Sequence, residues 1–459
     1  MPDDELAFAS VLDLAALVRA REVSPRELVE LYRRRIDRLD PQLNAYVTLA
    51  DDPEPAGDGP FFGVPLPIKD LTDTAGLRTT YSCKAFAENV PTEDAAVVRR
   101  IRAAGFTIIG KTNTPEFGTI AMTESELNGD CRNPWDTSRT PGGSSGGAAA
   151  AVAAGLAPAA HGSDGGGSIR IPSSCCGLFG IKPARGRVSP APHVSGSLGL
   201  GTSGPIARTV RDAAALLDVM AGNEPGDMYV APPPERPFLA EAERPPGRLR
   251  IAVTVEPPAP VPVDPTCAAA AQHAAGLLTE LGHDVVEATP PWQSDELIPY
   301  FIRVWQVGPA TAGVEDLALL EPIDRMFAED ARATSSPVYV AAVMELQQQV
   351  RRVLPFWDEY DVVVTPTLAL PPVPIGWTWA DVDGDPYRAF ANQVLFTPFT
   401  AFVNVTGQPA ISVPLHWSDE GLPIGVHVIG RPFAEATLVR LAAQLEEARP
   451  WAGRRPPVS

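Results

Sequence analysis

The sequence has few of the side chains from which a metal site or a disulfide framework is built. It contains five cysteines and six histidines in 459 residues. No two cysteines have the Cys-x-x-Cys spacing, and no two histidines have the His-Glu-x-x-His spacing of zinc enzymes. An odd number of cysteines along so long a chain is also not typical of a secreted disulfide scaffold. We therefore expect no metal, no cofactor, and small buried cysteines in a reducing compartment.

Long apolar runs are also missing. The stretch 148–154 is among the longest and is far too short to span a bilayer. The acidic start, Met1-Pro2-Asp3-Asp4-Glu5, lacks the apolar segment of a secretory signal. The formal net charge of −19 argues against nucleic acid as a partner, because an acidic surface repels phosphate backbones. We expect a cytoplasmic protein that binds neither nucleic acid nor membranes; a homodimer stays open.

Helix and strand patterns alternate along the chain. A capping box at Ser24-Pro25-Arg26-Glu27 begins a helix that we expect to end at Asp40-Pro41. Short apolar runs predict strands at 64–68, 106–109, 249–255, 284–288, 361–364, 410–413 and 424–429. Helices are expected at 94–104, 265–281, 341–354 and 435–448. This order predicts one large α/β domain with a mixed, largely parallel, twisted sheet flanked by helices on both faces.

One stretch imitates a nucleotide-binding loop. Residues 105–112 fit the pattern GxxxxGK[ST] letter for letter. Such a loop follows its strand and opens a helix. Here the residues between the two glycines are themselves apolar and strand-like, and Asn113-Thr114-Pro115 follows. We reject nucleotide binding and interpret Lys111 as a surface residue or as a residue behind a site.

A second stretch imitates the nucleophile elbow of α/β-hydrolases. Residues 142–146, Gly-Gly-Ser-Ser-Gly, fit GxSxG. The elbow needs a strand immediately before it, but residues 133–140 are polar and turn-like. An α/β-hydrolase-type esterase with a Ser-His-Asp triad remains an alternative at this point. Its histidine would be one of His273, His283, His416 and His427.

Three segments together resemble the amidase signature family. They are Gly-Val-Pro-Leu-Pro-Ile-Lys-Asp at 63–70, Gly-Gly-Ser-Ser-Gly-Gly at 142–147 and Asp-Gly-Gly-Gly-Ser-Ile-Arg at 164–170. Their order and spacing also fit the family. The resemblance is strong over 60–215 and resumes at 404–414 and 421–432. Residues 165–177 look most like the branch of 6-aminohexanoate cyclic dimer hydrolases.

The resemblance implies an amidase without metal or cofactor, acting on carbon–nitrogen bonds other than peptide bonds. Ser168 would attack the amide carbonyl and form an acyl-enzyme. Lys69 would be the base, which requires a neutral amine and hence a lowered pKa. Ser144 would relay the proton, with a cis peptide bond before it that Gly143 makes sterically easier. Ser145 is interpreted as a structural hydroxyl at a helix N-terminus.

The glycine-rich loop around the proposed nucleophile supplies the remaining site residues. The backbone N–H groups of Gly165, Gly166 and Gly167 would form the oxyanion hole, since glycine leaves room for a carbonyl oxygen. Asp164 and Arg170 flank the loop, and an ion pair between them would brace it.

The family pattern also suggests how the chain is organised. We divide the single amidase domain, 1–459, into N-terminal helices (1–60), the signature catalytic core (60–215), a proline-rich connection (231–247), a pocket-shaping part (248–400) and a C-terminal return to the core (401–459). Within 290–400 we expect pocket aromatics among Trp292, Tyr300, Phe301, Trp305, Tyr339, Trp357 and Trp377.

The expected substrate is a small-molecule amide, linear or cyclic, of the 6-aminohexanoate dimer type. An alternative is the A subunit of a tRNA-dependent amidotransferase, which shares the Ser-Ser-Lys residues but works on glutamine in an assembly. The acidic balance of the chain and the variants Lys69-Asp70-Leu71 and Cys175-Cys176 argue against that alternative.

Overall fold

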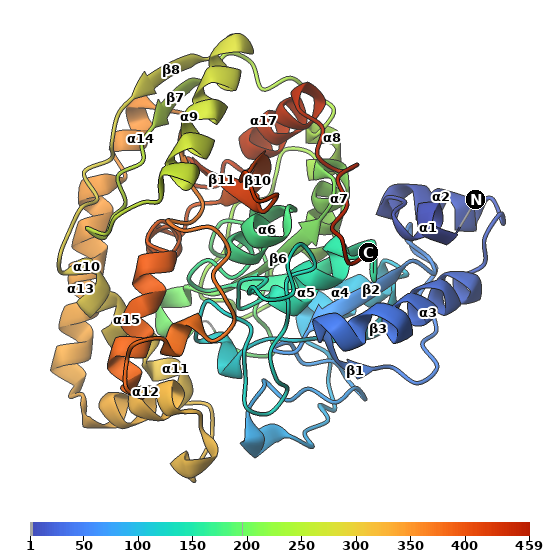
Figure 1. The fold of residues 1–459 in the computed structure, drawn as a ribbon, viewed down its shortest axis with the longest axis horizontal. Helices are drawn as coiled ribbons and strands as arrows, with labels where there is room; N and C mark the ends of the chain where they lie inside the picture. The colour runs from blue at the N-terminus through green and yellow to red at the C-terminus, as the bar shows by residue number, and fades with distance from the viewer. Residues whose placement is uncertain (1–2, 195) are drawn as a thin grey trace.

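An eight-stranded sheet forms the centre of the computed structural model, which describes residues 3–194 and 196–459 (Figure 1). Met1 and Pro2 of the acidic start therefore lie outside the described residues. The order of the strands is β4-β6-β5-β10-β11-β9-β7-β8. Their bounds are β4 Ala159–Asp164, β5 Phe179–Lys182, β6 Thr202–Ala207, β7 Arg250–Val253, β8 Asp284–Glu287, β9 Val362–Pro366, β10 Ala410–Trp417 and β11 Pro423–Gly430.

This sheet is mixed, as predicted, but the expectation that it is largely parallel is wrong. Among the described strands, β7 pairs in parallel with β8 and with β9, and the other five pairings are antiparallel. The connection between β10 and β11 spans only residues 418–422, and so short a link can join only antiparallel neighbours. Alternating apolar runs reveal that strands exist, but they do not fix their direction.

A smaller sheet lies beside the large one and carries Lys69 at the end of a strand. Its order is β1-β3-β2, with β1 Tyr46–Leu49, β2 Pro65–Lys69 and β3 Thr107–Thr112. Strands β2 and β3 are parallel and are joined through helix α4, Ala96–Ala103. Most of the stretch 105–112 therefore forms the buried strand β3. It does not form a phosphate loop, as the apolar pattern predicted.

Two short buried helices hold the other two signature segments. Helix α5, Gly146–Ala153, begins directly after Ser145, and every residue of it is buried. Helix α6, Arg170–Cys176, begins two residues after Ser168 and is also buried throughout. Alanine and glycine at α5 let it pack closely between neighbouring elements. Both helices place their N-terminal ends near the end of β4, where the site forms.

The N-terminal helices are α1 Asp3–Ala7, α2 Val11–Arg19 and α3 Pro25–Leu43. The capping box at Ser24 and Glu27 is present, as predicted. The predicted end of α3 at Asp40 is wrong by one turn, because the helix continues through Pro41 to Leu43. Asn44, in the left-handed conformation, ends it. A proline removes only one N–H, and the helix tolerates that loss in its last turn.

The second half of the chain is richer in helices than the sequence patterns suggested. The predicted helices correspond to α9 Pro265–Glu280, α13 Ser336–Val353 and α17 Glu435–Ala448. Three helices that we did not predict, α10 Leu297–Trp305, α12 Pro322–Ala333 and α15 Pro386–Phe396, gather with α13 on one side of the molecule (Figure 1). The remaining helices are α7 Val210–Met220, α8 Phe238–Glu241, α11 Val307–Ala310, α14 Phe356–Glu359 and α16 Ala401–Thr406.

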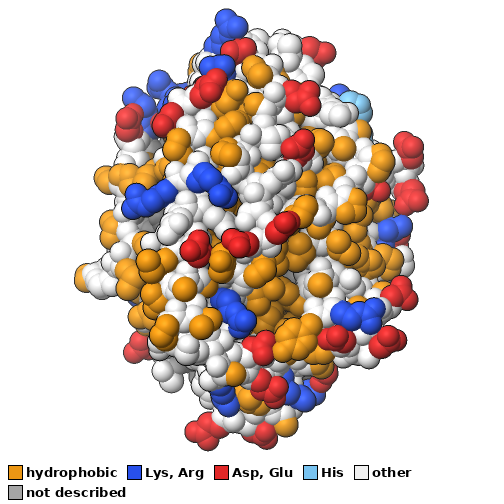
Figure 2. Space-filling view, turned by 90° about the vertical axis from the view of Figure 1, so that its left-hand side faces the viewer, with side chains coloured by type: hydrophobic (Ala, Val, Ile, Leu, Met, Phe, Trp, Pro, Cys, Tyr) orange, Lys and Arg blue, Asp and Glu red, His pale blue; other side chains and the backbone are white. Residues whose placement is uncertain are grey.

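The face on that side carries apolar side chains in separate areas between acidic and basic residues (Figure 2). Over the described residues, no helix has both the length and the apolar composition needed to cross a membrane. The five cysteines are all buried and free. The division of the chain into the five parts named above stays a prediction.

Candidate active site

Lys69 lies at the centre of a cluster formed by the three signature segments. Its side chain is fully buried, and its Nζ is 2.7 Å from Ser144 Oγ and 3.4 Å from the carbonyl oxygen of Ser163. Burial lowers the pKa of the Lys69 ammonium to about 7, against the opposing effect of the Asp164 carboxylate. Among the described residues, no carboxylate forms an ion pair with Nζ. Much of Lys69 is therefore a free amine near neutral pH, able to accept a proton.

Ser144 follows a cis peptide bond from Gly143, which is the geometry that the family resemblance implied. Gly143 passes very close to another backbone segment, because a Cβ built on it would lie 2.8 Å from the backbone nitrogen of Met122. A side chain at position 143 would push these segments apart. The position therefore requires glycine for close packing.

Ser145 is structural, but not in the way that we expected. It is the N-cap residue of α5, yet its hydroxyl makes no capping hydrogen bond. The hydroxyl instead donates to the carbonyl oxygen of Ser163 at 3.1 Å and accepts the N–H of Ser163 at 3.3 Å. The backbone N–H of Ser145 also donates to the carbonyl oxygen of Ser168 at 3.2 Å. Ser145 thus joins the start of α5 to the loop that carries Ser168.

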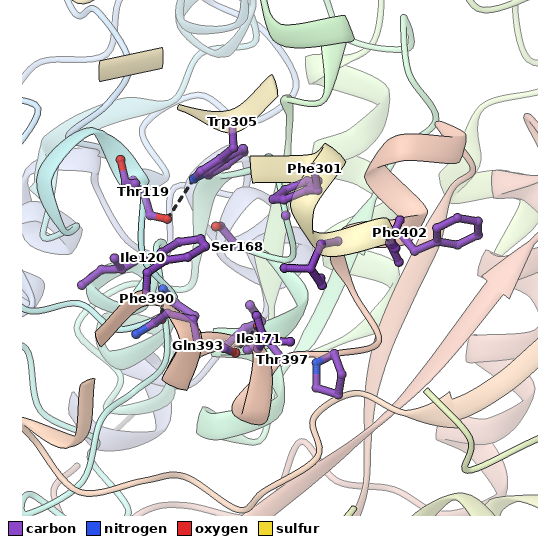
Figure 3. A pocket seen from close by; sticks show the side chains of 18 residues that line it. Thr119, Ile120, Ser168, Ile171, Phe301, Trp305, Phe390, Gln393, Thr397 and Phe402 are labelled. Atoms are coloured by element: carbon purple, nitrogen blue, oxygen red, sulfur yellow. Dashed lines mark hydrogen bonds between the residues drawn. The ribbon is translucent and has the colours of Figure 1, made fainter. Parts of the chain in front are cut away.

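Ser168 stands in the glycine loop between β4 and α6, with 7% of its surface exposed. Its hydroxyl borders the pocket drawn in Figure 3. Among the described residues, no hydrogen bond joins the hydroxyls of Ser168 and Ser144. Hydrogen bonds of this kind often tighten only when a substrate is bound.

The glycine loop offers fewer free backbone donors than the sequence suggested. The N–H of Gly167 donates to Asp164 Oδ1 at 2.8 Å, so it is already occupied. Within the described part of the chain, the N–H groups of Gly165, Gly166 and Ser168 have no acceptor. These three remain as candidate donors to an oxyanion.

The predicted ion pair between Asp164 and Arg170 is present and fully buried. Arg170 contacts Asp164 from Nε at 2.9 Å and from Nη2 at 2.8 Å. Burial alone would raise the pKa of Asp164, but the Arg170 guanidinium holds it well below its usual range. Arg170 also donates to Asn404 Oδ1 at 2.6 Å and to the carbonyl oxygen of Thr400 at 3.0 Å.

Asn404 and Thr400 are site residues that our residue-by-residue reasoning missed. The Asn404 amide donates to Asp164 Oδ1 at 2.9 Å, and the Thr400 hydroxyl donates to the carbonyl oxygen of Gly166 at 2.7 Å. The sequence held one signal, since the family resemblance resumes at 404.

His161 is a further missed residue, and it bears on the α/β-hydrolase alternative. Its Nδ1 accepts the backbone N–H of Lys69 at 3.4 Å, and its Nε2 is 3.1 Å from Ser203 Oγ. Burial lowers the pKa of His161 to about 3, which keeps the ring neutral. Among the described residues, no histidine hydrogen-bonds to Ser144, Ser145 or Ser168. A Ser-His-Asp triad is therefore not assembled at the GxSxG segment.

Lys111 is not a surface residue, so that part of our interpretation is wrong. Its side chain is fully buried in β3 and donates to the carbonyl oxygen of Thr72 at 2.7 Å and to Thr79 Oγ1 at 2.6 Å. Asp70 Oδ1 lies 3.7 Å from its Nζ. Burial lowers the pKa of Lys111 to about 8. Lys111 thus holds the segment that follows Lys69 in place through hydrogen bonds to Thr72 and Thr79.

Ser168 lines a largely apolar pocket. It holds about 720 Å³, its open mouth included, and none of its 18 lining residues is charged at neutral pH. Phe301 and Trp305 line it, as the aromatic pattern of 290–400 suggested, and the Trp305 indole donates to the carbonyl oxygen of Thr119 at 3.2 Å (Figure 3). Trp292 and Trp357 belong to the core instead. Phe390 and Phe402 line the pocket and were not predicted.

Comparisons with known proteins agree on one family. The Amidase family model matches residues 27–439. A Mycobacterium tuberculosis protein named "Putative amidase AmiB2" is 44% identical, with all of both chains covered. The 6-aminohexanoate-cyclic-dimer hydrolase of Pseudomonas sp. is 40% identical over 96% of this chain and 95% of that protein.

The fold agrees with the sequence comparison. A solved structure of 6-aminohexanoate cyclic dimer hydrolase with its substrate superposes with a TM-score of 0.93, at 36% identity, over 98% of this chain and 99% of that chain. The chain belongs to the amidase signature family and is a hydrolase of amide carbon–nitrogen bonds other than peptide bonds.

Proposed function

We propose that this enzyme hydrolyses a small uncharged amide through an acyl-enzyme on Ser168, with Ser144 as proton relay and Lys69 as base. The observation that carries the proposal is the 2.7 Å contact between the buried Lys69 amine and the Ser144 hydroxyl, at the edge of the Ser168 loop. A serine hydroxyl is a poor nucleophile until a neighbouring base accepts its proton.

The proton follows one path in both directions. Ser168 attacks the amide carbon while its proton passes to Ser144, and the Ser144 proton passes to Lys69. The C–N bond then breaks, and the leaving nitrogen takes a proton from Ser144, which Lys69 replaces. Water attacks the acyl ester by the same relay and releases the carboxylic acid. The N–H groups of Gly165, Gly166 and Ser168 would stabilise the oxyanion of each tetrahedral intermediate.

The charge of the pocket indicates the class of substrate. None of the residues that line it is charged. A linear 6-aminohexanoate dimer carries an ammonium on its acyl half, and this group would lose hydration in the pocket without gaining an opposite charge. The cyclic dimer has no charge. The pocket therefore favours a neutral amide such as the cyclic dimer, the compound in the name of the Pseudomonas relative.

The same argument weighs against glutamine. Its α-ammonium and α-carboxylate groups would also enter the pocket without charged partners. The described pocket thus gives no support to the amidotransferase alternative.

Two measurements test the proposal. The purified enzyme should hydrolyse 6-aminohexanoate cyclic dimer and neutral N-alkyl amides much faster than the linear dimer or glutamine. A fluorophosphonate should label Ser168, as seen by peptide mass spectrometry, and Ser168→Ala should lose both label and turnover. The matched variant Ser145→Ala should keep the label on Ser168. Labelling of Ser144 or Ser145 instead, or glutamine as the best substrate, would refute the proposal.

A further inference from the structure

Leu71, two residues after Lys69, stands directly beside the proposed proton relay. A Cβ built on Gly118 would lie 2.6 Å from Leu71 Cδ1 and 2.9 Å from Ser144 Oγ. The Leu71 methyl group and the Ser144 hydroxyl therefore both lie against Gly118 and close to each other. Gly118 has a φ of +71°, a conformation that favours glycine, and a side chain there would collide with both Leu71 and Ser144.

Leu71 also lines a hollow other than the apolar pocket at Ser168. Gly118 lines the apolar pocket at Ser168. Leu71 lines a second hollow of about 810 Å³, its open mouth included, together with the more polar residues Thr72, Ser163, Thr202 and Ser203. The carbonyl oxygen of Ser163 accepts the 3.4 Å contact from Lys69 Nζ. The second hollow is thus linked to Lys69 through Ser163, while the first hollow is lined by Ser168 itself.

The proposed chemistry assigns the two hollows to the two halves of an amide. The acyl carbon becomes bonded to Ser168, so the acyl chain extends into the apolar pocket. The leaving nitrogen must come within hydrogen-bond reach of Ser144 Oγ, because that hydroxyl gives it the proton. The amine half therefore lies close to Ser144, and Leu71 is an aliphatic side chain beside that hydroxyl.

We infer that Leu71 selects the amine half of the substrate by its contact with the groups attached to the leaving nitrogen, and that the amine half leaves toward the polar hollow beyond it. This inference rests on the proposed function above. Ile120, which lines the apolar pocket, contacts the acyl half instead. The two aliphatic side chains thus make a matched pair for a test.

The test compares Leu71→Ala with Ile120→Ala on two series of amides. The first series keeps a hexanoyl group and varies the amine as N-methyl, N-butyl and N-phenyl. The second keeps N-butyl and varies the acyl group as acetyl, hexanoyl and phenylacetyl. Leu71→Ala should raise kcat/KM for the N-phenyl amide relative to the N-methyl amide by about tenfold, and leave the acyl ratios unchanged. Ile120→Ala should change the acyl ratios only.

Acyl transfer gives a second readout that does not depend on the cleavage of an amide. With ethyl hexanoate as acyl donor and butylamine as acceptor, the amine must attack the acyl-enzyme from the place where a leaving amine departs. The ratio of N-butylhexanamide to hexanoate should therefore shift in Leu71→Ala and stay constant in Ile120→Ala. If Leu71→Ala folds poorly, Leu71→Val should give a smaller change in the same direction.

The outcomes separate this inference from the proposed function. Equal changes in both amide series, or an unchanged transfer ratio, would overturn the role of Leu71 even in an active amidase. If the unmodified enzyme cleaves none of these amides, or if Ser168→Ala keeps its activity, the proposed function itself fails.

Discussion

Arg170 donates two hydrogen bonds to the carboxylate of Asp164, at 2.9 and 2.8 Å, and both side chains are fully buried. Asp164 in turn accepts the N–H groups of Gly167 and Ile169, one on each side of Ser168. The ion pair therefore fixes the loop that presents Ser168.

The first prediction concerns this ion pair. Arg170→Met should lower the free energy of unfolding by about 3–5 kcal/mol, because it leaves the Asp164 charge buried without its partner. Urea denaturation followed by circular dichroism measures the change. The double variant Asp164→Asn, Arg170→Met should recover part of the loss, since no unpaired charge remains. A single variant as stable as the unmodified protein would contradict this account.

The second prediction concerns the pH dependence of Lys69. Its pKa is lowered to about 7, so the amine is protonated below that pH and can no longer accept a proton. The value of kcat/KM should therefore fall about tenfold for each pH unit below about 7. Lys69→Met should reduce it by about three orders of magnitude and remove this limb. The exposed Lys84 provides the control, because Lys84→Met should leave the profile as it is.

The third prediction concerns Thr400. Its hydroxyl holds the carbonyl oxygen of Gly166 at 2.7 Å, next to two of the free N–H groups of the loop. Thr400→Val keeps the shape of the side chain but loses that hydrogen bond. We expect kcat to drop about tenfold while the unfolding midpoint changes little, because the oxyanion donors lose their alignment. Thr406→Val serves as the control, since the Thr406 hydroxyl donates to the carbonyl oxygen of Val403 and not to the loop.

The fourth prediction concerns a buried acidic pair behind the pocket. Glu116 and Asp324 are 2% and 3% exposed, and each has one carboxyl oxygen without a hydrogen-bond partner. Burial raises the pKa of both groups, and it raises the pKa of the neighbouring Glu321 to about 8. A raised pKa in the folded state means that the protonated form stabilises the fold and that this stability is lost as pH rises.

Urea midpoints measured between pH 5 and pH 9, a range that includes the pKa of about 8 of the neighbouring Glu321, test this pair. The unmodified protein should lose stability toward the alkaline end. Asp324→Asn cannot ionise, so it should lose less and become the more stable of the two near pH 9. Parallel curves for the two proteins would show that folding does not raise the pKa of Asp324.

The fifth prediction concerns metals. In the part of the chain that the structure describes, no three His, Cys, Asp or Glu side chains come together as a metal site requires. Activity should therefore survive prolonged dialysis against a chelator. A loss that zinc restores would contradict the metal-free mechanism.

Local sequence alone determined most strands, the start of α3 and the three segments that carry the proposed catalytic residues. The apolar runs located most strands of the two sheets, and the capping box located the start of α3. The three signature segments singled out Lys69, Ser144 and Ser168, and the structure brings their segments together. These features depend on neighbours in the chain, such as capping residues, periodicity and glycine-rich turns, so a linear reading can find them.

Only the tertiary structure decided the burial, the hydrogen-bond partners and the pocket of the candidate site. The lowered pKa of Lys69 follows from burial by segments far apart in the chain, and no local pattern sets it. The contacts of Arg170 with Asn404 and Thr400 cross more than half of the chain. Part of the pocket wall comes from α10 and α15, two helices that the sequence patterns did not lead us to predict. Burial and hydrogen bonding at a site depend on which distant elements pack there, and that is fixed only when the whole chain folds.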